Sequence, residues 1–248
     1  MDLAYYNQKQ AEDGPAMTFA IAAIAENLVA ASGCSAFTYE LQSRFPNYRA
    51  LFFQMSKQAN NDINANGGVN PAFPFLKGHG GFLQIVPFGY LGLDYHQENL
   101  TIQPSLPLPF KHLQPPEFQY KGASIKAQMN STHTKITMIS SPLGMSNWTL
   151  PMTLNHPNSQ PHSQYWLRLN QTITVPNDMY WKNPITHKNL LQCRPVSSKA
   201  TTLPGHWAGA ATDGNVGTRW EPISRNTSQL IVDMTDVTSQ PIERIHID

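Results

Sequence analysis

The chain has 248 residues, which is long enough to bury the core of one large domain or of two smaller ones. Its net charge is +1 and charged residues make up only 13% of the total, so it lacks the basic surface by which proteins bind nucleic acid. Ten of its 20 prolines lie in the middle third of the chain, which favours loop-rich β structure over a helical bundle.

The first 31 residues predict a helix. Asp13-Gly14-Pro15 is a start signal, because proline is tolerated in a first turn, and Ser32-Gly33 is an end signal. Apolar side chains recur at close to helical spacing at Met17, Ala20, Ile21, Ile24, Leu28 and Val29. We expect this helix to be buried between others. It is too short to span a bilayer and no basic segment precedes it, so we expect neither a membrane span nor a signal peptide.

Aromatic residues are frequent between 37 and 56, and such rings either fill a core or form platforms for sugars; we favour the core.

The next distinctive stretch is the loop at 66–81. Pro71 and Pro74 exclude a helix interior, and the glycines at its end let the main chain approach a ligand closely. Its apolar residues, which we expect to anchor it on a core, are Ala72, Phe73, Phe75 and Leu76. On these residues alone, a buried connection with a hydrogen-bonded His79 is favoured over a binding loop.

The remainder of the chain predicts mostly β structure. Residues 82–96 resemble a strand interrupted by Pro87, and the proline-rich residues 99–116 resemble an extended linker. Alternating segments then predict the strands of a small antiparallel sandwich, at 118–129, 132–139, 165–169 and 172–175. Further strands are expected at 230–234 and 242–247, and a turn at Asp213-Gly214.

The two cysteines, Cys34 and Cys193, are either free buried thiols or a single bridge, and free thiols are our default expectation. The histidines lack metal-ligand spacing and no nucleotide-binding motif is present, so no metal or cofactor is expected. The acceptor sequence for N-glycosylation recurs in the second half, which favours a secretory-pathway protein. Its asparagines are Asn99, Asn130, Asn147, Asn170 and Asn226.

Residues 66–81 resemble the "NGG…NPAFPFLTGHGG" signature of fungal acid trehalases, in the trehalase and maltose phosphorylase family of glycoside hydrolases. Residues 13–18, 32–39 and 82–93 are similar to neighbouring family motifs. Residues 210–220 resemble the start of a discoidin-type carbohydrate-binding module. The resemblance implies a mixed α and β fold: residues 1–98 as the C-terminal part of an (α/α)6 helical barrel, with 82–96 helical; 99–195 as an antiparallel β-sandwich; and 196–248 as a partial second β-sandwich, a truncated discoidin-like module.

By the same resemblance, the chain is a segment of an enzyme that hydrolyses α,α-trehalose with inversion. Such enzymes need two carboxyl groups about 6.5–9.5 Å apart, one acid and one base. The family's general base is a glutamate where this chain has Lys57, and a protonated ammonium has no lone pair to accept a proton. Asp62 and Glu40 are candidate substitutes for this base, but both lie outside the motif position. By the same resemblance, the family's proton donor is expected upstream of Met1.

The resemblance implies a substrate site in which trehalose or a related glucoside contacts the loop at 66–81. The residues expected to bind it are Asn70, Lys77, Gly78, His79, Gly80 and Gly81. We expect the chain not to be catalytic alone, and its partner to be the N-terminal part of the same enzyme. The family is extracellular or vacuolar. The alternatives are a non-catalytic carbohydrate-binding polypeptide and a truncated pseudo-enzyme.

Overall fold

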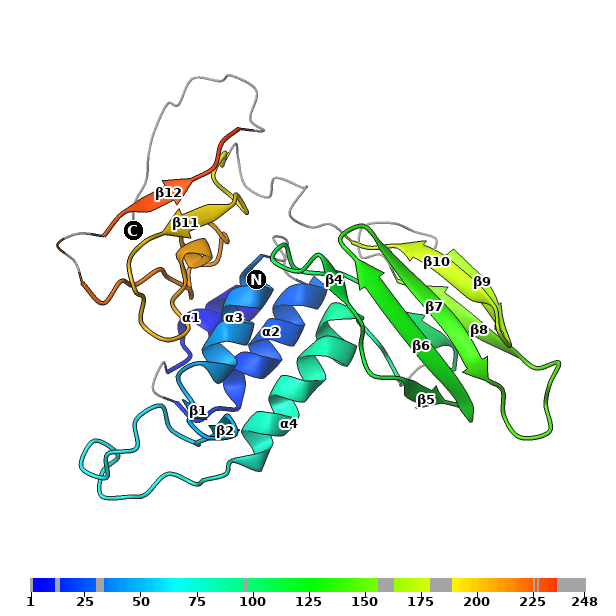
Figure 1. The fold of residues 1–248 in the computed structure, drawn as a ribbon, viewed down its shortest axis with the longest axis horizontal. Helices are drawn as coiled ribbons and strands as arrows, with labels where there is room; N and C mark the ends of the chain where they lie inside the picture. The colour runs from blue at the N-terminus through cyan, green and yellow to red at the C-terminus, as the bar shows by residue number, and fades with distance from the viewer. Residues whose placement is uncertain are drawn as a thin grey trace.

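The computed structural model describes residues 2–11, 14–29, 34–95, 98–155, 163–178, 189–224, 226 and 228–235. These residues form a helical region in the middle, two β-sheets on one side of it, and a C-terminal segment on the other side (Figure 1). The expected helix signals at Asp13 and at 32–33, and the expected strand at 242–247, lie outside the described residues.

Four α-helices form the helical region: α1 (Asp2–Gln8), α2 (Thr18–Val29), α3 (Ser35–Arg44) and α4 (Leu76–Gln84). The prediction of one helix over residues 1–31 was therefore correct in type but wrong in continuity. Residues 14–16 form a bend, in which the Ala16 N–H donates to the Lys57 carbonyl at 2.9 Å rather than to a helical carbonyl. The next two short strands, β1 (Tyr48–Arg49) and β2 (Gln54–Met55), pair with each other.

Helix α4 continues directly into a π-helical segment, η1 (Ile85–Tyr90). The strand predicted from the pattern at 82–96 was wrong, and the helix implied by the family resemblance is confirmed for residues 82–90 but not for 91–95. Pro87 removes one main-chain donor, and the following turn widens so that the Leu91 N–H donates to Val86 O at 3.0 Å. Gly89 of η1 is buried against Ile24 of α2, where an added Cβ would make ordinary van der Waals contact at 3.4 Å from Ile24 Cα.

The larger sheet has five antiparallel strands in the order β10-β7-β6-β4, with β5 also paired to β6 (Figure 1). Its strands are β4 (His112–Leu113), β5 (Phe118–Tyr120), β6 (Ala123–Asn130), β7 (His133–Ser140) and β10 (Thr172–Pro176). Alternate residues of β6 are buried, as expected for a sheet with one covered face. The strand predictions here are confirmed, except that a turn at 121–122 splits the first one.

The smaller sheet contains β3 (Leu100–Ile102), β8 (Thr149–Leu154) and β9 (Ser163–Arg168), in that order. Strand β3 runs parallel to β8, so the expectation of purely antiparallel pairing was wrong. Strand β3 also shows that residues 99–116 are not a simple linker. Leu100, Ile102 and Leu106 are buried, and the Asn27 amide on α2 donates to Ser105 O at 2.9 Å. The proline-rich passage therefore fixes the sheets to the helices.

One cluster of buried side chains extends from α2 and α3 through η1 and β3 into the five-stranded and the three-stranded sheet, which together are called the two larger sheets below.

The C-terminal segment carries β11 (Val196–Ser198), the 3-10 helix η3 (Ala208–Ala211) and β12 (Leu230–Val232), which pairs with β11. A disulfide between Cys34 and Cys193, with Cα atoms 5.9 Å apart, joins this segment to the start of α3. The default expectation of free thiols was wrong, because the fold brings together residues 159 positions apart.

Candidate functional site

The loop predicted to bind substrate lies between β2 and α4, and main-chain hydrogen bonds hold its second half in place. The Phe75 N–H donates to Met55 O at 2.7 Å, and the Lys57 N–H donates to Ala72 O at 3.0 Å. The loop contains a cis peptide bond before Pro74. Residues 77–81, predicted to end the loop, instead form most of α4.

The apolar residues of this loop do not anchor it as predicted. Ala72 is exposed, Phe73 is 53% exposed and Leu76 is 76% exposed, so only the half-buried Phe75 contributes to packing. The preceding loop behaves in the same way, since Phe52 is 87% exposed. The expectation that aromatic residues of 37–56 fill the core is therefore wrong for this position. Phe52, Phe73 and Leu76 thus share one feature: none of the described residues packs over most of their apolar surface.

His79 is used to hold the loop. Its Nε2 lies 3.3 Å from the Met55 nitrogen and its Nδ1 lies 3.0 Å from Phe75 O. Because a backbone N–H can only donate, Nε2 is the acceptor and Nδ1 carries the proton. His79 is thus a neutral imidazole with both nitrogens bound to main-chain atoms. This geometry agrees with the hydrogen-bonded histidine that the residues alone favour.

The other predicted binding residues fall into two groups. Asn70 and Lys77 are exposed. Gly78 is buried where a Cβ would lie 2.9 Å from Ala16 O, so glycine is required there by packing against the bend before α2. Gly80 faces open space, whereas Gly81 lies against α2, where an added Cβ would be 3.2 Å from the Cβ of Ala20. The segment thus presents Asn70, Lys77 and Gly80 to solvent.

Lys57 lies two residues after the end of β2, and its carbonyl accepts from the Asn47 amide at 3.3 Å and from the Ala16 N–H. The two other carboxylates that are candidates for the base, Glu40 and Asp62, each accept hydrogen bonds from groups elsewhere in the chain. Glu40 is buried and accepts from the Tyr90 hydroxyl at 2.6 Å, and burial raises its pKa despite that bond and Arg44. Asp62 is exposed and caps its own turn by accepting from the Asn64 N–H at 2.9 Å.

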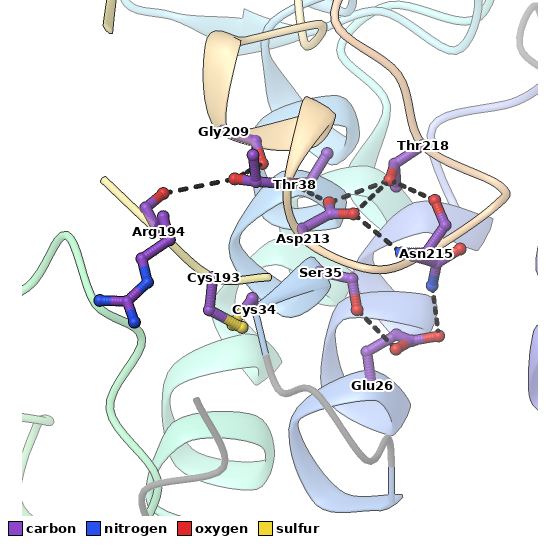
Figure 2. Close-up of a disulfide and its surroundings, with 11 residues drawn as sticks. Glu26, Cys34, Ser35, Thr38, Cys193, Arg194, Gly209, Asp213, Asn215 and Thr218 are labelled. Atoms are coloured by element: carbon purple, nitrogen blue, oxygen red, sulfur yellow. Dashed lines mark hydrogen bonds between the residues drawn. A yellow bond between two sulfur atoms is a disulfide. The ribbon is translucent and has the colours of Figure 1, made fainter. Parts of the chain in front are cut away.

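A second polar cluster lies where the C-terminal segment meets α2 and α3, beside the disulfide (Figure 2). Asp213 is buried and accepts hydrogen bonds from Thr38 Oγ1 at 2.7 Å, Thr218 Oγ1 at 2.8 Å and the Asn215 N–H at 3.0 Å. The predicted turn at Asp213 is confirmed, but sequence reasoning missed its contact with α3. The "DG" turn signal shows only the local part of this role.

Glu26 on α2 completes the cluster. Its carboxylate accepts from Ser35 Oγ at 2.6 Å and from the Asn215 amide at 2.9 Å, and Asn7 also donates to it. Burial raises the pKa of Glu26, and burial together with the nearby Glu26 raises the pKa of Asp213 to about 7. Asn215 therefore links two buried carboxyl groups, one from the helices and one from the C-terminal segment (Figure 2).

Within the described ranges, no group of three histidine, cysteine, aspartate or glutamate side chains is arranged to hold a metal ion. Over the same residues, no helix has both the length and the apolar character needed to cross a membrane.

No family model matches the chain. Among curated proteins, "Acid trehalase" of Emericella nidulans is 38% identical over 259 residues, covering 98% of this chain and 24% of its own. "Cell wall acid trehalase" of Arthroderma benhamiae is 38% identical over 245 residues, covering 96% of this chain and 23% of its own. A "Protein-glucosylgalactosylhydroxylysine glucosidase" of Dictyostelium discoideum is 30% identical over 145 residues, covering 56% and 18%.

Among solved structures, "Putative kojibiose phosphorylase from human microbiome" covers 66% of this chain and 20% of its own, with 12% identity and a TM-score of 0.42, a likeness too weak to support an argument. The sequence relatives define the chain as a homologue of glycoside hydrolases. More narrowly, it is homologous along nearly its whole length to the fungal acid trehalases. The chain spans about a quarter of the length of these relatives.

Proposed function

We propose that this chain forms part of an enzyme that hydrolyses α,α-trehalose to glucose by an inverting acid/base mechanism. The observation that carries the proposal is the 38% identity to acid trehalases over 98% of the chain. The most specific motif of the family resemblance, residues 66–81, covers the loop that leads into α4 and the first part of α4 itself. The mechanism needs no metal or cofactor, since protons are moved by two carboxyl groups.

The domain assignment follows from the same relationship. Residues 1–98, with helices α1 to α4 and η1, are the C-terminal part of an (α/α)6 barrel. Residues 99–195, with the two larger sheets, form the β-sandwich domain. We assign residues 196–248 to a discoidin-like module. The exposed apolar side chains around 51–53 and 73–76 support an incomplete helical barrel, because a closed barrel would cover them.

We assign binding of glucoside hydroxyls to the segment from Asn70 to Gly81. Asn70 and Lys77 supply exposed polar groups, and Gly80 leaves open space for a sugar. Gly78 and Gly81 allow close packing on α2, and His79 positions the segment through both ring nitrogens. In this arrangement, the histidine acts through the loop and the polar groups act on the sugar.

Catalysis requires residues that the described part of this chain does not supply. Lys57 occupies the general-base position, and an ammonium group cannot accept a proton from water. The partner we propose is therefore the N-terminal part of the same type of enzyme, which contributes the acid and covers the exposed apolar loops. The names of relatives and the N-glycosylation sequences favour an extracellular location. Of those asparagines, Asn147, Asn170 and Asn226 are exposed.

The test joins this chain to the N-terminal three-quarters of the Emericella nidulans relative and measures glucose release from trehalose. We expect no turnover by the isolated chain. In the chimera, Lys57→Glu is expected to raise kcat by about 10²–10⁴-fold, which is the usual contribution of a positioned general base. Lys126→Glu, on the exposed side of β6, is the matched control and should change nothing. Turnover by the isolated chain that is abolished by Lys57→Ala would contradict the proposal.

The absence of a base at position 57 specifically favours a second candidate, sugar binding without turnover. Calorimetric titration of the chain with trehalose tests it. Saturable binding that is lost on Asn70→Ala, together with a chimera that stays inactive after Lys57→Glu, would favour this candidate over the first. No binding to the chain or to the chimera would count against both.

A further inference from the structure

Residues 205–218, called the 205–218 segment below, lie against α3 through a chain of polar contacts. Trp207 Nε1 donates to Thr38 Oγ1 at 2.9 Å, and Thr38 Oγ1 in turn donates to the Asp213 carboxylate at 2.7 Å. The ring of Trp207 also packs edge-on against Phe37 of α3, with ring centres 4.9 Å apart. The contact between this segment and α3 therefore ends on a buried carboxyl group.

Asn215 joins the same segment to a second carboxyl group, on α2. Its side-chain amide donates to Glu26 Oε1 at 2.9 Å, and its side-chain oxygen accepts from the Tyr39 hydroxyl at 3.3 Å and from the Gly217 N–H at 2.8 Å. Its backbone N–H donates to Asp213 at 3.0 Å. One residue of the segment therefore bonds to both acids (Figure 2).

Both carboxyl groups are buried without a bonded cation among the residues that the structure describes. Asp213 is 2% exposed and Glu26 is 3% exposed, and their partners are hydroxyl, amide and backbone N–H groups. Arg194 lines the same pocket as Asp213, but its Nε donates to Leu190 O at 3.2 Å and its side chain points away from Asp213 (Figure 2). Ionisation would thus place two like charges in one buried interface.

The other titratable groups around this interface do not neutralise those charges. On α3, Glu40 and Arg44 pair with each other at 3.2 Å. Burial raises the pKa of Tyr39, and the two nearby acids raise it further, so this phenol stays neutral. Further charged or titratable groups of α1 and of the C-terminal segment are bonded to neither acid: Asp2, Lys9, Lys199, His206, Arg219, Glu221 and Asp233.

Each carboxyl group has a hydroxyl neighbour that can accept its proton. Thr218 Oγ1 lies 2.8 Å from Asp213 Oδ1 and 3.0 Å from Asn215 O, so it can accept from a protonated Asp213 while donating its own hydrogen to that carbonyl. Ser35 Oγ lies 2.6 Å from Glu26 Oε2 and can likewise accept from a protonated Glu26. The observed arrangement therefore accommodates both acids in their neutral form.

The ionised acids favour separation of the segment from the helices. Burial is the main cause of the raised pKa of both groups, because a buried charge loses its hydration. The pKa of Asp213 is about 7 instead of the ordinary 3.8, and the charge of Glu26 adds to the effect. Moving the segment away returns both acids to water, where they ionise normally. Separation therefore releases protons, and it becomes easier as pH rises from about 4 to 7.

The disulfide keeps the segment close when its polar contacts break. It joins Cys193, shortly before the segment begins, to Cys34 at the start of α3. The Cys193 N–H donates to Thr212 O at 2.7 Å, so the fixed end is also bonded to the middle of the segment. No residue of the segment belongs to the cluster of buried side chains that joins the helices to the sheets. The segment can therefore separate without disrupting that cluster.

We propose that residues 205–218 form a pH-operated latch, which is closed on α2 and α3 while Asp213 and Glu26 carry protons and opens as one unit when they ionise. The disulfide limits the movement, so closing is an intramolecular step. This device goes beyond the proposed hydrolysis and does not depend on it, because it shares no residue with the loop at 66–81 or with Lys57.

Hydrogen exchange of backbone amides, followed by NMR on the whole chain with its disulfide intact, tests the proposal between pH 5 and pH 7. The protection factor, which corrects the rate for the intrinsic effect of pH, reports the opening equilibrium. For Gly217 and Thr218, whose N–H groups both donate to Asn215, we expect it to fall at least about thirtyfold over this range, as protons are lost.

The amides of Ala127 and Ile136, paired between β6 and β7, report the sheet for comparison. They should remain more protected than Gly217 at every pH, because they exchange only when the core opens. Low concentrations of urea should speed their exchange but leave that of Gly217 unchanged, since a local opening exposes little surface. This difference separates opening of the latch from unfolding of the whole chain.

Asp213→Asn keeps one acceptor oxygen and replaces the other oxygen by an NH2 group, which imitates the protonated acid. It should hold the latch closed at pH 7, with a protection factor at Gly217 at least about tenfold above that of the unmodified chain. Glu26→Gln should act in the same direction, and it serves as the test if Asp213→Asn does not fold. Asp62→Asn, at an exposed turn, is the matched control and should exchange as the unmodified chain does.

Three outcomes would overturn the proposal. The first is protection of Gly217 and Thr218 that stays constant or rises between pH 5 and pH 7. The second is exchange of these amides at the same rate and with the same urea dependence as Ala127 and Ile136, which would mean that the segment opens only on global unfolding. The third is a pH dependence that both Asp213→Asn and Glu26→Gln leave unchanged, which would assign it to other groups.

Discussion

The two larger sheets and the helical region differ in how they bury their side chains. In the sheets, Ile125, Ile136 and Leu150 are fully buried. In the helical region, the buried set includes the charged Glu26 and Glu40, while Phe52 is 87% exposed. The sheets thus bury the apolar side chains between them, although Trp166 of β9 is 60% exposed, whereas the helical region buries two carboxyl groups and leaves Phe52 of the β1–β2 loop uncovered.

This difference shows which part of the chain is structurally self-sufficient. A sheet that alternates apolar and polar residues directs one set to a core and the other to solvent, so its core-facing residues are buried when the two sheets and η1 pack together. The helices need specific hydrogen-bonded partners for Glu26 and Glu40, and further apolar surface for the loops around 52 and 73. We expect the two regions to respond differently to substitution.

The largest effect is expected at the disulfide that joins the helical region to the C-terminal segment. Replacing Cys34 and Cys193 together by alanine removes a cross-link that closes a loop of 159 residues, and should lower the free energy of unfolding by about 4 kcal/mol. Urea denaturation measures it. Reduction of the unmodified chain with dithiothreitol should give the same loss, and equal stabilities with and without the cross-link would show that the segment is held by its other contacts.

The next effect concerns the core of the sheets. Ile136→Ala removes a fully buried side chain of β7 and leaves a cavity, so it should lower the free energy of unfolding by about 3 kcal/mol. Thermal denaturation followed by circular dichroism measures it. Ile139→Ala, at a 39% exposed position of the same strand, is the control. Similar losses for both variants would mean that the sheet does not have one covered face.

The polar cluster predicts a dependence on pH. The pKa of Asp213 is raised from 3.8 to about 7, so between these values the folded state keeps a proton that the unfolded state has lost. Stability is therefore greatest at acid pH and falls as pH rises through about 4 to 7, by about 2 kcal/mol between about pH 5 and pH 7. Glu26, whose pKa is also raised, acts in the same direction.

Urea denaturation at a series of pH values checks this slope, and Asp213→Asn should make it shallower. Asp62→Asn, at an exposed turn, is the control and should retain the slope of the unmodified chain. A stability that rises from acid to neutral pH in the unmodified chain would show that the carboxyl groups fold in their charged form.

The smallest effect on stability is expected at the exposed aromatic loop. Phe52→Ser should change the free energy of unfolding by no more than about 0.5 kcal/mol, because the ring is already in solvent. The same variant should reduce self-association of the isolated chain, measured by analytical ultracentrifugation, because it removes exposed apolar surface. A loss comparable to that of Ile136→Ala would mean that Phe52 is packed and that the contrast between the regions is wrong.

Sequence patterns predicted the elements whose signals are local. The alternation in 123–130 and 133–140 predicts strands because side chains of a strand point to opposite faces. The same reasoning failed at 82–90, where an apolar run of this length fits a strand or a buried helix equally, and contact with α2 decided the outcome. Likewise, proline content alone could not show that 99–106 contains a strand and buried residues.

For the candidate site, the sequence singled out the loop at 66–81 and its glycines, since these are properties of residue type, while the family resemblance predicted that Lys57 stands in the place of a catalytic glutamate. It could not show that both nitrogens of His79 bind main-chain atoms, or that Phe73 and Leu76 are exposed. It also could not pair Cys34 with Cys193 or place Glu26 beside Asn215. These facts depend on which distant segments meet, and that is decided by the packing of the whole chain rather than by local spacing.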